Sequence, residues 1–190
     1  MPVDSPNLTM TGFHGCDADS VPSIKADNFK CSTGEHHWLG EGVYFFSAGI
    51  SNPSEDAQRW AIAQSWDSRT GSRSYLKFSV LKAEISPANP LDMTNDTGKA
   101  KVNLAREALT RRMKPQKGYV DNAIIQWLAE KYGFDVLVQD FYIQMTRERK
   151  MGLRSRFPNV RVICVRKPHS AIDKDSISVT YTALIPSNPI

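Results

Sequence analysis

The chain has 190 residues, 41% of them hydrophobic, which is enough to bury one core and favours a single domain over residues 1–190. No apolar run approaches the roughly 18 residues of a membrane-spanning helix, and the segment "MPVDSPNLTM" lacks the basic and apolar regions of a secretory signal. The sequence therefore argues against a membrane protein, and we expect a cytoplasmic one.

The net charge of +4 conceals two strongly basic segments. Residues 99–117 contain seven Lys or Arg and one acidic residue, and residues 147–167 contain eight and one. Segments of one sign attract phosphates or an acidic partner surface, although they are also typical of solvated helix faces. They make nucleic acid or an acidic protein an expected partner.

The cysteines indicate neither a disulfide framework nor a metal site. Cys16, Cys31 and Cys164 are odd in number and far apart, which fits a reducing compartment. A site built from Cys16, Cys31, His36 and His37 would lack any C-x-x-C pair, and neighbouring histidines rarely bind one ion together. We therefore expect no metal.

In chain order, the first expected element is an apolar strand at residues 8–15. A short helix follows at 17–27, where Asp19 or Ser20 is a suitable cap and Pro22 suits the first turn. These two elements place the segment "GFHG" at the end of a strand.

A second apolar strand is expected at 42–46, and the clearest helix follows at 51–66. Ser51 or Asn52 can cap this helix, Pro53 suits its first position, and two acidic residues favour its first turn. The segment "GVYFF" therefore leads directly into a well-capped helix.

The rest of the chain supplies four strands and two helices. Residues 74–85 alternate apolar and polar side chains, which predicts a strand with one face exposed to water. Two apolar stripes predict helices at 100–113 (Leu104, Ala108, Leu109) and 119–132 (Ile124, Ile125, Leu128). The last strands are expected at 134–141, 160–166 and 176–184. Strands flanking a helical insertion predict an α+β domain with a largely antiparallel sheet.

Two short blocks carry a resemblance to a known family. The first is "GFHG", with His14 and Gly15, and the second is "GEGVYFF", with Gly42 and Tyr44; the histidine and the tyrosine are 30 positions apart. With the helix that follows, these blocks resemble the first two signatures of the poly(ADP-ribose) polymerase-like ADP-ribosyltransferases, the diphtheria-toxin-like branch whose triad is written H-Y-E. The resemblance covers about residues 10–66. It implies a split antiparallel sheet with flanking helices, and NAD as the substrate.

The resemblance also implies roles for single residues. His14 would offer a ring nitrogen to the ribose on the adenosine side, and Gly15 would offer backbone hydrogen bonds to the nicotinamide amide. Tyr44 would stack on the nicotinamide ring, while Gly42 lets the backbone approach the ligand closely. Taken singly, a histidine beside a glycine or a tyrosine in an apolar run is more typical of structural positions.

Two further residues are candidates for the NAD site. Trp60, on the helix after the tyrosine strand, is the candidate second aromatic wall, although a tryptophan on an amphipathic helix is more often part of the core. Ser47 could add a hydroxyl contact to the carboxamide.

The third member of the triad departs from the family pattern. Arg161 stands where the family has a glutamate at the start of a late strand, and a guanidinium group cannot act as a base. Either Glu148 or Gln144 takes the role, or the acceptor differs from the usual protein carboxylate. Without the glutamate, transfer of a single ADP-ribose unit is expected, with His14, Tyr44 and Arg161 as catalytic residues.

The sequence thus predicts an NAD-dependent mono-ADP-ribosyltransferase that modifies nucleic acid or protein. Small catalytic domains of this kind resemble toxins of bacterial or phage conflict systems, for which an antitoxin or inhibitor protein is an expected partner. Two alternatives stay open: an NAD glycohydrolase, and an inactive NAD- or RNA-binding module of the same fold.

Overall fold

The computed structural model describes residues 8–33, 37–111 and 121–187. Their main feature is a seven-stranded sheet in the order β6-β7-β8-β2-β1-β5-β9, in which only β6 and β7 run parallel. The strands are β1 (Met10–Asp17), β2 (Val43–Ser47), β5 (Lys77–Ile85), β6 (Pro90–Asp92), β7 (Val136–Phe141), β8 (Val160–Val165) and β9 (Ser178–Leu184). The predicted α+β class with a mostly antiparallel sheet is confirmed.

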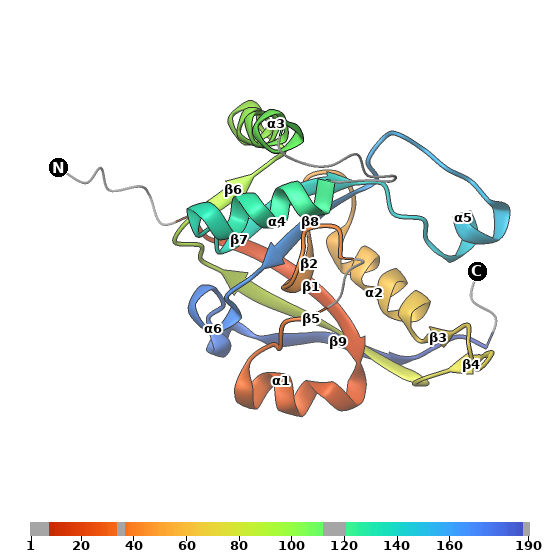
Figure 1. The fold of residues 1–190 in the computed structure, drawn as a ribbon. Helices are drawn as coiled ribbons and strands as arrows, with labels where there is room; N and C mark the ends of the chain where they lie inside the picture. The colour runs from red at the N-terminus through yellow and green to blue at the C-terminus, as the bar shows by residue number, and fades with distance from the viewer. Residues whose placement is uncertain (1–7, 34–36, 112–120, 188–190) are drawn as a thin grey trace.

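Helices cover both faces of this sheet (Figure 1). They are α1 (Val21–Asp27), α2 (Pro53–Gln64), α3 (Asp96–Thr110), α4 (Asp121–Tyr132), α5 (Thr146–Met151) and α6 (Pro168–Ala171), with short 3-10 turns η1 (Ala18–Ser20) and η2 (Lys174–Ser176). A small hairpin of β3 (Trp66–Asp67) and β4 (Ser72–Arg73) follows α2. Within the described ranges, no helix has the length and apolar character needed to cross a bilayer.

Two hydrophobic clusters fill the space between the layers. The larger one joins α2, α3 and α4 to one face of the sheet, and the smaller one joins α1 and α6 to the other face. Side chains alternate between the two clusters along β2, so Phe46 belongs to the first and Phe45 to the second. Each sheet face therefore has its own core.

The sheet is almost divided between β1 and β2. β1 pairs with β5 over eight residue positions and β2 pairs with β8 over five, but β1 and β2 pair only at Phe13 and Phe46. The two strands that carry the family-like blocks thus face each other across a gap in the ladder.

Helix α2 begins as the sequence predicts. The Asn52 side chain accepts hydrogen bonds from the backbone N–H groups of Ser54 (3.1 Å) and Glu55 (3.5 Å), and Pro53 occupies the first helical position. Of the two predicted caps, Asn52 is therefore the one used.

Two details of the sequence prediction are wrong. Strand β5 is predicted to have one face exposed to water, but Phe78 and Val80 belong to one hydrophobic cluster and Leu81 and Ala83 to the other, so both of its faces are covered. Ser79 is 1% exposed and hydrogen-bonded to Thr182. On α3, Leu104 is 66% exposed, and the side chains packed into the core are those of Val102, Ala105 and Leu109. Both stripes satisfy a helical period, and only packing against α4 selects between them.

Candidate functional site

A cavity of about 410 Å³ opens where β1 and β2 separate. Its lining includes five residues predicted from the sequence: His14, Gly15, Gly42, Tyr44 and Trp60. Loop residues 30, 32, 37 and 38 and the β8 residue Val162 complete much of the remaining wall. The structure thus brings the two family-like blocks and α2 together around one space.

His14 bridges the gap in the sheet with its ring. Its Nδ1 lies 2.8 Å from the backbone carbonyl oxygen of Tyr44, and the ring packs against Phe29 and Phe45 at centroid distances of 5.1 and 5.5 Å. Burial lowers the pKa of His14, so the ring is neutral near pH 7. Because a carbonyl oxygen only accepts, Nδ1 carries the proton and Nε2 is left as an acceptor.

Tyr44 is held by its hydroxyl group. The hydroxyl donates to the carbonyl oxygen of Gly40 (2.6 Å) and accepts from the backbone N–H of Leu39 (3.0 Å). Burial raises the pKa of Tyr44, so the phenol stays protonated. The ring stacks on His37 with centroids 5.6 Å apart and an interplanar angle of 27°. Tyr44 is therefore a fixed, uncharged stacking surface.

Trp60 belongs to an aromatic group at the cavity wall. Its ring lies 5.9 Å from that of Trp38 and 6.5 Å from that of Phe46. Trp38 and His37 were missed as cavity residues in the sequence, where His37 was considered only as a metal ligand. Their position just before the second family-like block, in "HHWLGEGVYFF", was the available signal.

The two predicted glycines line the cavity, but packing already requires them. A Cβ atom at Gly15 would collide with the backbone carbonyl of Ala57 on α2, and one at Gly42 would lie 2.5 Å from Sγ of Cys164 on β8. The ligand roles predicted for them, backbone hydrogen bonds from Gly15 and close approach at Gly42, stay predictions, and packing gives each glycine a reason of its own. They let a helix and a neighbouring strand approach the backbone.

Arg161 and Ser47 lie outside the cavity lining. They are directly opposite each other in the β2–β8 register, and Arg161 is also opposite Asp140 on β7. The Arg161 guanidinium donates from Nε (2.7 Å) and Nη2 (3.1 Å) to the two carboxylate oxygens of Asp140. This bond raises the pKa of Arg161. The β8 residue that lines the cavity is Val162, whose side chain is on the other sheet face.

The two alternatives for the third role are also engaged elsewhere. Glu148 accepts from the backbone N–H of Met145 (3.0 Å) and from the Tyr142 hydroxyl (3.2 Å), and Gln144 donates to the carbonyl of Leu153. Among the described residues that line the cavity, none is Asp or Glu. On the β8 side, the described lining therefore offers the apolar side chain of Val162 and no carboxylate.

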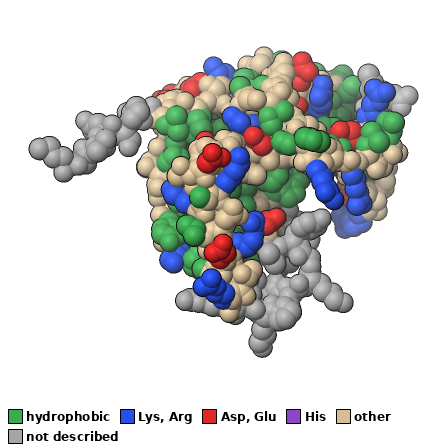
Figure 2. Space-filling model, turned by 90° about the horizontal axis from the view of Figure 1, so that it is seen from above, with side chains coloured by type: hydrophobic (Ala, Val, Ile, Leu, Met, Phe, Trp, Pro, Cys, Tyr) green, Lys and Arg blue, Asp and Glu red, His purple; other side chains and the backbone are tan. Residues whose placement is uncertain are grey.

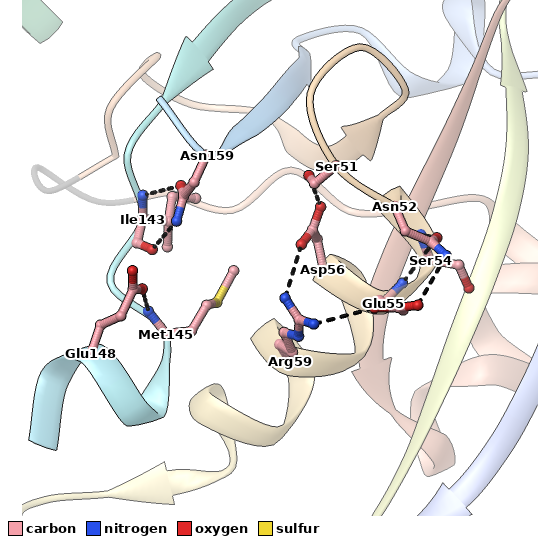
Figure 3. A network of polar contacts seen from close by, with 10 residues as sticks. All are labelled: Ser51, Asn52, Ser54, Glu55, Asp56, Arg59, Ile143, Met145, Glu148 and Asn159. Carbon is pink, nitrogen blue, oxygen red and sulfur yellow. Dashed lines mark hydrogen bonds and ion pairs between the residues drawn. The ribbon is translucent and has the colours of Figure 1, made fainter. Parts of the chain in front are cut away.

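Figure 3 shows polar contacts within two segments, the start of α2 and the connection after β7, and these elements contribute Trp60 and Ile143 to the cavity lining. The Ser51 hydroxyl donates to the buried Asp56, whose pKa burial raises, and Arg59 lies 3.9 Å from the same carboxylate. On the facing segment, Asn159 accepts from the backbone N–H of Ile143 (2.8 Å) and donates to its carbonyl (3.0 Å). Ile143 is in this way pinned at the cavity wall.

The metal-ligand cluster considered from the sequence includes His36, which lies outside the described residues. Within residues 8–33, 37–111 and 121–187, no three His, Cys, Asp or Glu side chains are grouped closely enough to hold a metal ion.

No protein-family model matches the chain. Over 80 residues the chain is 31% identical to a protein of Methanocaldococcus jannaschii described as "Uncharacterized protein MJ0359". The similar segment makes up 41% of the present chain and 33% of that protein, so the chain spans about a third of the relative's length. A similarity of this extent does not assign the chain to a family.

Proposed function

We propose that the protein is an NAD-dependent mono-ADP-ribosyltransferase. The observation that carries the proposal is the meeting of His14 and Tyr44 in one aromatic-walled cavity at the gap between β1 and β2. These are the two residues that the family resemblance assigns to NAD. The two blocks are 30 positions apart in the chain, and the neighbouring strands β1 and β2 bring them to the same cavity.

The chemistry of the lining suits the nicotinamide riboside part of NAD. Tyr44 and Trp60 offer aromatic faces to a flat ring, and Nε2 of His14 can accept a hydrogen bond from a ribose hydroxyl. A volume of about 410 Å³ is at the small end of the range of about 300–1,000 Å³ for small-molecule pockets. The diphosphate and adenosine would then extend past Lys30 at the cavity wall, whose ammonium group can pair with phosphate.

The proposed step breaks the bond between C1′ of the ribose and the nicotinamide nitrogen. The electron pair leaves with nicotinamide, which becomes neutral, and C1′ passes through an oxocarbenium-like state. A nucleophilic atom of the acceptor then forms the new bond to C1′ and releases its proton to solvent. Fixed stacking by Tyr44 and a fixed ribose contact to His14 would keep C1′ in line with the acceptor.

Val162 at the wall favours a particular kind of acceptor. The described lining residues include no carboxylate, so they supply no base of the kind that the family's glutamate would be. An acceptor that is already nucleophilic would not need one. The same observation also favours the second candidate function, an NAD-binding module without turnover, and an NAD glycohydrolase is the third outcome to be separated.

The acceptor surface that we propose is the segment from α5 to β8. The exposed side chains of Arg147, Arg154 and Arg156 make no ion pair with described residues, and Phe157 is 83% exposed among them. Figure 2 shows Lys and Arg side chains at the right-hand edge, the side on which α5 lies in Figure 1. Cations beside an exposed aromatic ring suit single-stranded nucleic acid. A toxin role and an antitoxin partner remain part of this proposal.

The test uses NAD labelled in its adenosine part. The purified protein is incubated with this NAD and a whole-cell extract, which is then divided into nuclease-treated and protease-treated halves. Release of nicotinamide with label on macromolecules supports the transferase, and the treatment that removes the label identifies the acceptor. Release without label indicates a glycohydrolase. Binding of NAD without release indicates the inactive module, and no binding at all contradicts the proposal.

A further inference from the structure

A second cavity, of about 300 Å³, lies on the other side of Trp38. Trp38 lines both cavities, so its side chain is the wall between them. The new cavity is lined by Trp38, by Gln139 and Phe141 of β7, and by Lys99, Asn103 and Arg106 of α3. None of these residues belongs to either family-like block.

Gln139 is the polar group that this cavity leaves unsatisfied. It stands opposite Val162 in the β7–β8 register, and its Oε1 is buried without a hydrogen-bond donor. A buried amide oxygen without a partner is unfavourable, and a ligand that donates a proton would remove the penalty. Rotation of the amide can present either its oxygen or its NH₂ group, so Gln139 suits a ligand edge with a donor beside an acceptor.

The α3 side of the cavity is cationic. Lys99, Asn103 and Arg106 lie three to four residues apart and so share one helix face. Arg106 donates to Oδ1 of Asn103 (2.6 Å) and to Asp121 (3.3 Å), which also lines the cavity. One carboxylate thus faces two cations, and the Lys99 ammonium makes no ion pair with described residues. An excess of positive charge at a cavity favours an anionic ligand.

The remaining wall is aromatic. The rings of Trp38 and Phe141 lie 5.4 Å apart at 35°, and Trp38 is 39% exposed. Base-stacking surfaces on proteins are built from such rings because every nucleobase has a π face.

We propose that this second cavity binds a nucleobase together with its 5′-phosphate. The base would stack on Trp38 and hydrogen-bond to Gln139, and the phosphate would lie against Lys99. The inference deepens the proposed function and rests on it for one point, that the bound nucleotide is the acceptor. The shared wall would then place the acceptor beside the NAD cavity.

The experiment titrates the protein with single nucleotides in the absence of NAD. Calorimetry compares the four 5′-mononucleotides with uridine and with inorganic phosphate. We expect at least one mononucleotide to bind about fivefold or more tightly than either fragment, because base and phosphate contact different walls.

Variants assign the bound nucleotide to a cavity. Gln139→Met removes the amide at similar volume, and Lys99→Gln removes the cation; each should weaken binding by about three- to tenfold. The matched control is Lys101→Gln on the same helix, since Lys101 faces the ring of Phe134 (5.4 Å) and does not line the cavity. It should bind as the unaltered protein does. Lys99 is exposed, so Lys99→Gln keeps the test valid if Gln139→Met fails to fold.

The other outcomes overturn the inference. Absence of mononucleotide binding removes the site. Binding that Lys99→Gln leaves unchanged and His14→Gln weakens would place the nucleotide in the NAD cavity. A separate NAD titration tests the proposed function. NAD binding without mononucleotide binding contradicts this inference and leaves the proposed function standing. If Lys99→Gln weakens mononucleotide binding and the protein does not bind NAD, the transferase function is contradicted and the second-cavity site is supported.

Discussion

His14 connects the fold to the site through its two ring nitrogens. Nδ1 donates to the Tyr44 carbonyl across the gap in the sheet, and this contact leaves Nε2 as an acceptor for a ligand. The same ring packs against Phe29 and Phe45, which excludes water from it. One ring nitrogen of His14 therefore serves the fold, and the other can serve a ligand.

The lowered pKa of His14 predicts a pH-dependent stability. Because the folded protein binds this proton less readily than the unfolded chain, whose value is near 6.5, the free energy of unfolding falls as pH drops through that value. We expect the stability advantage of the unaltered protein over His14→Gln to shrink as the pH falls from 7.5 to 5.5. Urea unfolding at the two pH values measures it. An advantage that grows on acidification would mean that His14 is charged in the fold.

Tyr44 should contribute a ring to NAD binding. Replacement by Ala removes a stacking surface worth about 1–3 kcal/mol, so NAD affinity should fall about ten- to a hundredfold. Tyr44→Phe is the matched control, since it keeps the ring and loses only the hydroxyl bonds to Gly40 and Leu39. It should bind NAD within a few fold of the unaltered protein. Equal NAD affinity in the unaltered protein, Tyr44→Ala and Tyr44→Phe would show that Tyr44 does not stack on NAD.

Arg161 should stabilise the fold, because its guanidinium group donates two hydrogen bonds to Asp140 on the sheet face away from the cavity. The side chains of Arg161 and Asp140 are 29% and 24% exposed, so we expect Arg161→Ala to lower the free energy of unfolding by about 1–2 kcal/mol. A double-mutant cycle with Asp140→Ala measures the coupling. If Arg161→Ala abolishes nicotinamide release while its stability is unchanged, the catalytic role predicted from the sequence is right.

At the scale of elements, α2 and β1 determine the shape of the site. Helix α2 packs so closely on β1 that Gly15 has no room for a side chain, and this approach brings Trp60 to the cavity. The Asn52 cap fixes the residue at which α2 begins. The position of the aromatic wall thus depends on a glycine of the neighbouring strand.

Gly15→Ala should therefore damage the fold more than an ordinary surface glycine does. The added methyl group collides with the backbone of Ala57, and we expect a loss of about 1–3 kcal/mol in the free energy of unfolding, with weaker NAD binding. Gly133→Ala is the control, because its Cβ meets open space and only the positive φ of 69° opposes it. Thermal unfolding compares the two. If Gly15→Ala loses less stability than Gly133→Ala, helix α2 can shift away from β1 at little cost in free energy.

At the scale of the whole molecule, positive charge is concentrated on the segment that enters β8. Part of the other basic segment, residues 112–117, lies outside the described residues. On the described segment, Arg154 and Arg156 precede the exposed Phe157 in sequence, and the same connection brings Ile143 to the cavity. A nucleic acid docked on this surface would lie next to the site.

If the acceptor is nucleic acid, modification should weaken steeply with salt because contacts to phosphates release counterions. We expect the rate to fall roughly tenfold or more between 50 and 200 mM salt. Replacing Arg154 and Arg156 by Gln should lower the salt slope by about 1–2. Lys25→Gln, on α1 at the other sheet face, is the control and should leave the slope unchanged. A rate that does not change with salt would point to a small or neutral acceptor.

The sequence by itself determined the elements with strong local signals. Apolar runs gave β1, β2, β7, β8 and β9, and the cap and proline of α2 placed its start within a residue. Local signals failed for β6, which has only three residues and exists because it pairs in parallel with β7. The predicted pair His14 and Tyr44 met in one cavity because each lies at a fixed place in its own strand.

Only the tertiary structure decided which side chains reach the cavity. Arg161 and Val162 are neighbours in sequence, but successive residues of a strand face opposite sides, so one is bound to Asp140 and the other lines the site. Trp38 and Gln139 became cavity residues through contacts made far along the chain, with Trp60 and across from Val162. Local pattern sets the type of an element, whereas register and packing set which face of it meets the ligand.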